Sequence, residues 1–143
     1  MFINHPQQQL LFFVAQDFDD DLKEDVRQFV DELRALRDWV ISPPLFVDEC
    51  SESELGTPIR TLGGALMIYS ALPPNELPKE IDVRHLEEVE AIVGKISDFS
   101  REHELAIEFN LDGKFVGAVE DGNADRTLVQ GLVGEWKRHL GIN

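Results

Sequence analysis

The chain of 143 residues has the length of one domain, and its 43% hydrophobic and 29% charged residues exclude wholesale disorder. Twenty-eight Asp and Glu against thirteen Lys and Arg give a net charge of −15, and residues 17–54 alone contribute −9. This charge repels nucleic acids and anionic membranes, which are bound largely through Lys and Arg, and it attracts basic proteins.

The first two elements are predicted to be a strand and a helix. Residues 10–15 form an apolar run between polar residues, which is typical of a buried strand. Asp19 begins a run of three aspartates, which favour a helix N-terminus as caps and through the helix dipole. Helical spacing then predicts one apolar face: Leu22, Val26, Phe29, Val30, Leu33 and Val40. We expect Pro43 and Pro44 to end this helix.

Two strands and a second helix are expected in the middle of the chain. Residues 45–47 predict a short strand, residues 48–61 a surface loop rich in turn formers, and residues 65–72 a central strand. A helix is predicted over residues 82–103 with Asp82 as its N-cap. Its buried stripe is expected at Leu86, Val89, Ile92, Val93, Ile96 and Phe99.

Alternating apolar residues then predict a β-hairpin around Asp112 and Gly113. A two-residue turn would point Phe115 and Val119 away from the face that Phe109 occupies. A three-residue turn with Gly113 in the left-handed conformation would instead pair Phe109 with Phe115. We therefore expect a glycine bulge at Gly113.

A last helix is predicted over residues 124–140, with Gly141 as its C-cap and with Gly131 and Gly134 allowing close approach to a neighbouring element. Its inward positions are expected to be Leu128, Val129, Leu132, Val133, Trp136 and Leu140. The element order is β-α-β-β-α-β-β-α, of which the first six elements follow a split β-α-β pattern. We therefore expect a single α+β domain over residues 1–143, with three helices on one face of a largely antiparallel sheet of about five strands.

No motif in the sequence specifies a metal or cofactor site, and we expect neither. Two acidic clusters have the alternating spacing of a calcium loop: Asp17, Asp19 and Asp21, and Asp121, Asn123 and Asp125. Both lack the glycine and the glutamate that such a loop requires, and helix capping explains them better. The four histidines, at positions 5, 85, 103 and 139, form no metal-binding pair and are expected to be exposed or at helix ends.

The single cysteine, Cys50, has no partner for an internal disulfide, and the carboxylates around it oppose formation of a reactive thiolate. The apolar run over residues 10–15 is too short for a signal-peptide core or a membrane span. We therefore expect a cytoplasmic protein.

Charge without a catalytic motif favours a binding protein over an enzyme, and we expect it to engage a basic protein partner. Inhibitor and immunity proteins of basic toxins share this size and charge. The predicted contact residues lie in the expected loop: Asp48, Glu49, Glu52 and Glu54. Two alternatives remain open. One is a carboxylate- or metal-dependent hydrolase with a non-local site, and the other is a homo-oligomer, such as a homodimer, joined through a strand edge or the last helix.

Overall fold

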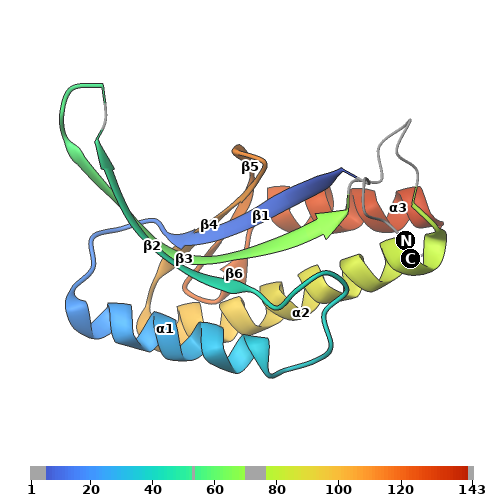
Figure 1. Ribbon diagram of the computed structural model, residues 1–143, viewed down its shortest axis with the longest axis horizontal. Helices are drawn as coiled ribbons and strands as arrows, with labels where there is room; N and C mark the ends of the chain where they lie inside the picture. Colours follow the sequence, from blue (N-terminus) through green and yellow to red (C-terminus); the bar gives the residue numbers. More distant parts are fainter. Residues whose placement is uncertain (1–5, 53, 70–76, 142–143) are drawn as a thin grey trace.

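The computed structural model describes residues 6–52, 54–69 and 77–141, and it confirms an α+β fold with one antiparallel sheet (Figure 1). The sheet has six strands, one more than expected: β1 (Gln7–Val14), β2 (Leu45–Glu52), β3 (Pro58–Tyr69), β4 (Ala106–Leu111), β5 (Lys114–Glu120) and β6 (Asn123–Ala124). The helical segments are α1 (Asp20–Arg34), α2 (Lys79–His103), the π-helical segment η1 (Thr127–Gly134) and α3 (Glu135–Leu140).

The strand order in space is β2-β3-β1-β4-β5-β6, and every neighbouring pair is antiparallel. Helix α1 connects β1 to β2, and helix α2 connects β3 to β4, so that each helix crosses over a strand that lies between the two it joins. This is the split β-α-β arrangement, extended at one edge by β5 and β6. None of the helices in the described part of the chain combines the length and the apolarity that a membrane span requires.

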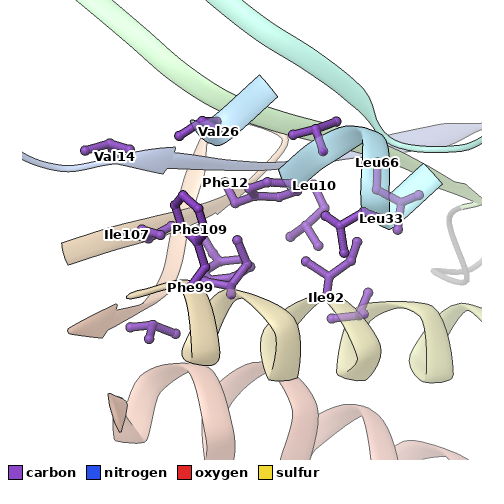
Figure 2. Packing of buried hydrophobic residues seen from close by; sticks show 14 of the residues in the cluster. Leu10, Phe12, Val14, Val26, Leu33, Leu66, Ile92, Phe99, Ile107 and Phe109 are labelled. Atoms are coloured by element: carbon purple, nitrogen blue, oxygen red, sulfur yellow. The ribbon is translucent and has the colours of Figure 1, made fainter. Parts of the chain in front are cut away.

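The core lies between one face of the sheet and the helices. Figure 2 shows Leu10 and Phe12 of β1 and Phe109 of β4 pointing toward Ile92 and Phe99 of α2. The rings of Phe12 and Phe109 lie 6.1 Å apart. Gly64 makes room for Phe12, because a Cβ at this position would lie 2.4 Å from the Cζ atom of that ring. The apolar residues at alternate strand positions therefore pack against the apolar stripe of α2 in one layer.

Helix α1 begins as predicted, with the Asp19 carboxylate accepting a hydrogen bond from the Leu22 N–H at 2.9 Å. It ends at Arg34, much earlier than the prolines suggested, and Val40 lies outside it. The indole of Trp39 donates to the Arg34 carbonyl at 3.2 Å, and this contact occupies an acceptor at the helix end. The chain then turns toward α2, where the Val40 N–H donates to Glu88. Val40 therefore matched the helical spacing of α1 only by chance.

The predicted loop over residues 48–61 is wrong, because most of it forms the long hairpin of β2 and β3 (Figure 1). Asp48 of β2 makes two ionic contacts, one with Lys23 of α1 at 2.9 Å and one with Arg60 of the paired strand β3 at 3.4 Å. The hydrogen bond from Lys23, followed by that from Arg60, holds the pKa of Asp48 below its ordinary value. The predicted strand over residues 65–72 is confirmed as far as Tyr69, and its last three residues lie outside the described residues.

Helix α2 begins at Lys79, with Pro78 at the cap position, so Asp82 is not its N-cap. A proline suits a helix start because it lacks an N–H, and N–H groups at a helix start have no acceptor within the helix. The carboxylate of Asp82 lies one turn further in and accepts a hydrogen bond from the Trp136 indole at 2.7 Å.

The hairpin of β4 and β5 has a two-residue turn, and the predicted bulge at Gly113 is wrong. Asp112 and Gly113 both have positive φ, 51° and 82°, as this tight turn requires. The register shifts between Phe109 and Asn110, which leaves Val116 as the extra residue on β5. This bulge keeps the favoured turn and still buries Val119 beside Ile107, while Phe115 points outward with 49% exposure.

The predicted last helix is divided between β6, η1 and α3. A π-helical turn holds more residues than an α-helical turn, so α-helical spacing misplaces its faces. Leu128 is buried as expected, but Val129 is 49% exposed. Neither Gly131 nor Gly134 approaches another element, since the atoms nearest to their missing Cβ belong to η1 itself. Gly141 caps α3 in the left-handed conformation, as predicted.

Candidate functional site

The four acidic residues predicted to bind a partner lie on the β2–β3 hairpin and do not converge. Asp48 and Glu49 are adjacent in β2 and therefore point to opposite faces of the sheet. Glu52 ends the strand and Glu54 lies in the exposed turn. Asp48 is already paired with Lys23 and Arg60, whereas Glu49, Glu52 and Glu54 are exposed. Cys50 is exposed on the same strand.

A groove with a volume of about 350 Å³ lies between α1 and α2, and it gathers carboxylates that the sequence analysis did not single out. We call it the acidic groove. Its carboxylates are Asp25 and Glu32 of α1 and Asp98 and Glu102 of α2. Residues spaced by seven on α1 and by four on α2 lie on one side of their helix, and the two sides face each other across the groove. Lys95 is the one lysine or arginine among the described residues that line it.

Aromatic side chains form the floor of the acidic groove. The rings of Phe29 and Phe99 lie 4.6 Å apart, and those of Phe99 and His103 lie 4.3 Å apart. Phe99 is buried, while Phe29 and His103 are half-buried. The groove therefore combines an aromatic base with negative walls.

Among the described residues, two of the four groove carboxylates have weak ionic partners and two have no ionic partner. His103 Nδ1 lies 3.9 Å from an Asp25 oxygen, and Arg101 lies 3.6 Å from Asp98 in a solvent-exposed pair. Within the described part of the chain, Glu32 and Glu102 have no ion-pair partner within 4.0 Å. Exposed pairs of this kind contribute little, so most of the negative charge is available to a ligand.

A second cavity, of about 360 Å³, lies where α3 and η1 meet α2 and the sheet. We call it the α3 pocket. Apolar side chains dominate its walls: Ile68, Leu111, Leu132 and Trp136. Gln8, Tyr69, Asp82, Glu135 and His139 add polar groups. A concave, mostly apolar site with a few polar groups is typical of a small-molecule pocket.

The closest approach to a catalytic pair is His85 and Glu88, which are both fully buried on α2, so the expectation that His85 is exposed or at a helix end is wrong. His85 Nδ1 lies 2.8 Å from Glu88 Oε1, and Nε2 accepts a hydrogen bond from the Tyr69 N–H at 3.1 Å. Because Nε2 is an acceptor, the hydrogen of the neutral ring is on Nδ1 and is donated to Glu88. Glu88 Oε2 accepts the Val40 N–H at 2.7 Å. Both ring nitrogens of His85 and both carboxylate oxygens of Glu88 therefore make hydrogen bonds with described residues.

The two acidic clusters cap helical segments, as the sequence suggested. Asp19 caps α1, and Asp125 Oδ1 accepts a hydrogen bond from the Leu128 N–H at 2.8 Å at the start of η1. Among the described residues, no three His, Cys, Asp or Glu side chains lie close enough together to hold a metal ion. His5 lies outside the described residues, and His139 lies on α3 at the rim of the α3 pocket.

Sequence reasoning missed Asp82, His85 and Glu88 as buried residues, although a signal was present. All three are in phase with the apolar stripe of α2, where a polar side chain needs an internal partner. The acidic groove could not be found in this way, because it depends on how two helices pack. No protein-family model, curated protein or solved structure matches the chain.

Proposed function

We propose that this protein binds a basic protein partner, and that a Lys or Arg side chain of the partner enters the acidic groove. The observation that carries the proposal is the set of four carboxylates around a floor of Phe29 and Phe99. An arginine guanidinium stacks on aromatic faces and pairs with carboxylates, so its chemistry complements both parts of the groove. The net charge of −15 would accelerate the approach of such a partner.

The β2–β3 hairpin is a second acidic surface for the same partner, but fewer observations support it than support the acidic groove. The salt bridge with Lys23 and the contact with Arg60 already offset the charge of Asp48. Glu49, Glu52 and Glu54 remain exposed on the protruding part of the hairpin (Figure 1), but none of them lines a cavity described above. They contribute to the long-range field, whereas the groove adds shape.

Removing groove charge is expected to abolish capture of the partner. The test variant carries Glu32→Gln, Asp98→Asn and Glu102→Gln, and the matched control carries Glu49→Gln, Glu52→Gln and Glu54→Gln. Both change the net charge by the same three units. Immobilised wild type is exposed to host lysate and washed at about 0.1 M and at about 1 M salt, and retained proteins are quantified by mass spectrometry. A basic protein should be retained at low salt by the wild type and the hairpin variant, and lost about tenfold or more from the groove variant.

Three results would contradict the proposal. If no basic protein is enriched by the wild type, the acidity serves solubility alone. Equal loss from both variants would show that only the diffuse field acts. Loss from the hairpin variant alone would assign the contact to Glu49, Glu52 and Glu54.

Self-association is a second candidate function, favoured by the sheet face that the helices leave uncovered. The helices pack on the side of Phe12 and Phe109. One row of paired residues on the other side runs through Leu45, Ala65, Leu11, Asn110 and Phe115. Its two ends are exposed large hydrophobic side chains, with 55% exposure for Leu45 and 49% for Phe115. A second copy could cover this row, against the mutual repulsion of two strongly acidic chains.

If this face dimerises, light scattering should show a mass that doubles as salt is raised, because salt screens the repulsion. The double variant Leu45→Thr and Phe115→Thr should remain monomeric, since threonine keeps strand propensity but removes the large apolar surface. Val129→Thr, at an equally exposed position on η1, is the control and should dimerise like the wild type. A monomer at every salt concentration rules out this function.

A further inference from the structure

We propose that the α3 pocket binds a small organic cation, namely a protonated amine carried on an apolar or aromatic body. The first observation is Asp82, whose side chain lines the pocket while the residue as a whole is only 4% exposed. A buried carboxylate is costly unless charge and hydrogen bonds compensate it.

The compensation available from the protein is incomplete. The Trp136 indole donates to Asp82 Oδ1 at 2.7 Å, and this is the one hydrogen bond that the carboxylate accepts from the described residues. No Lys or Arg lines the pocket among the described residues. The nearby cations are used elsewhere, since Arg138 pairs with Glu135 at 3.0 Å and Lys137 pairs with Glu90 at 3.2 Å. The second oxygen of Asp82 accepts no hydrogen bond from the described residues and reaches solvent, so it can accept from a ligand, and an ammonium group supplies both the donors and the charge.

The ionisable groups that face Asp82 favour a cation over an anion. Glu135 of α3 adds a second carboxylate to the pocket lining. Tyr69 of β3 and His139 of α3 are the other titratable groups there. A phosphate or carboxylate ligand would meet the like charge of Asp82, whereas an amine would meet an opposite charge; the charge of Glu135 is already offset by Arg138.

The rest of the pocket fits an apolar body. Ile68, Leu111 and Leu132 provide aliphatic walls, and the Trp136 ring offers the best side-chain surface for a cation–π contact. A cavity of about 360 Å³ falls at the lower end of the range for small-molecule sites. The ligand is therefore a compact amine with an alkyl or aryl group.

The π-helical wall is a second, independent observation. Gly131 and Leu132 of η1 line the pocket, and η1 is π-helical over eight residues. π-Helical geometry is rare, and π-helical turns within helices are frequent at functional sites. Leu132 of η1 and Trp136 of α3, which follows it directly, both contribute side chains to the pocket.

The test uses 2-phenylethylamine as the probe and 2-phenylethanol as its neutral counterpart. Binding is followed by the fluorescence of Trp136 in a Trp39→Phe background, which leaves one tryptophan. The amine should give a saturable change and bind at least about tenfold more tightly than the alcohol. Asp82→Asn keeps an oxygen for the indole but removes the charge, and it should weaken amine binding at least about tenfold while changing alcohol binding less than about twofold. Glu87→Gln, an exposed neutralisation on the same helix, should change neither.

A second readout in the wild type guards against a variant that fails to fold. The indole N–H resonance of Trp136 in a nitrogen–proton correlation spectrum should shift on addition of the amine, because the acceptor of that hydrogen bond becomes shared. The proposal is overturned by any of three results: no saturable change up to about 10 mM amine, equal affinity for amine and alcohol, or an indole resonance that stays in place. The groove variant should bind the amine normally, so failure of this site and failure of the proposed partner binding are distinguishable.

Discussion

Replacing Glu88 by alanine should lower the free energy of unfolding by about 3–5 kcal/mol. This is the largest effect that we expect from a single substitution on α2. The Glu88 carboxylate is fully buried and accepts hydrogen bonds from His85 Nδ1 and from the Val40 N–H. Alanine would leave both donors without their acceptor, the His85 ring nitrogen in a fully buried site and the Val40 N–H in a part-buried one. Each orphaned donor costs about 1–3 kcal/mol, and the missing side chain adds a cavity.

Urea denaturation provides the measurement, with the midpoint and the slope fitted separately. Glu87→Ala is the control, because Glu87 is the exposed neighbour on the same helix and should change stability by less than about 0.5 kcal/mol. A loss below about 1 kcal/mol for Glu88→Ala would mean that water or a rearranged chain satisfies the two donors.

An apolar replacement of the whole pair should not restore stability. Two of the hydrogen bonds in this network come from the backbone, from Tyr69 at the end of β3 and from Val40 before β2. A variant with His85→Phe and Glu88→Leu fills the space but leaves both N–H groups unsatisfied. The pair therefore fixes where β3 ends and how the α1–β2 connection meets α2, which apolar packing alone would not specify.

The parts of the fold that could be predicted from sequence are those with long, regular patterns. Helix α2 has six apolar residues in register, and five of them are buried, so its existence and face followed from spacing. The strand over residues 10–15 was predicted in the same way and is central in the sheet. The α+β class and the split order then followed from the sequence of elements.

The parts that could not be predicted depend on contacts distant in sequence. Residues 48–61 have many turn formers, yet most of them pair as β2 and β3, where Arg60 of β3 and Lys23 of α1 both reach Asp48. The bulge at Val116 is a compromise between turn chemistry and burial that no local rule decides. Asp82 looked like a helix cap because nothing nearby in sequence reveals Trp136, which is 54 residues away.

Replacing Gly117 by alanine should have the second large effect, lowering the free energy of unfolding by about 2–5 kcal/mol. Gly117 has a φ of 141°, which side chains with a Cβ rarely adopt. A Cβ there would also lie 2.6 Å from the backbone nitrogen of Leu128, where η1 crosses β5. Backbone atoms cannot yield as a flexible side chain can, so η1 must move away or β5 must distort.

Gly113→Ala separates the two contributions, because Gly113 lies in the same hairpin with a φ of 82° but has open space around its missing Cβ. The Gly113→Ala variant should lose only about 1–2 kcal/mol of unfolding free energy, which is the cost of the left-handed conformation alone. Equal losses in thermal or urea unfolding would show that the contact with Leu128 contributes nothing. A larger loss at Gly117 would instead show that η1 is fixed on β5 through this glycine. Because η1 also forms one wall of the α3 pocket, Gly117→Ala should then weaken binding of 2-phenylethylamine even at temperatures where the chain remains folded.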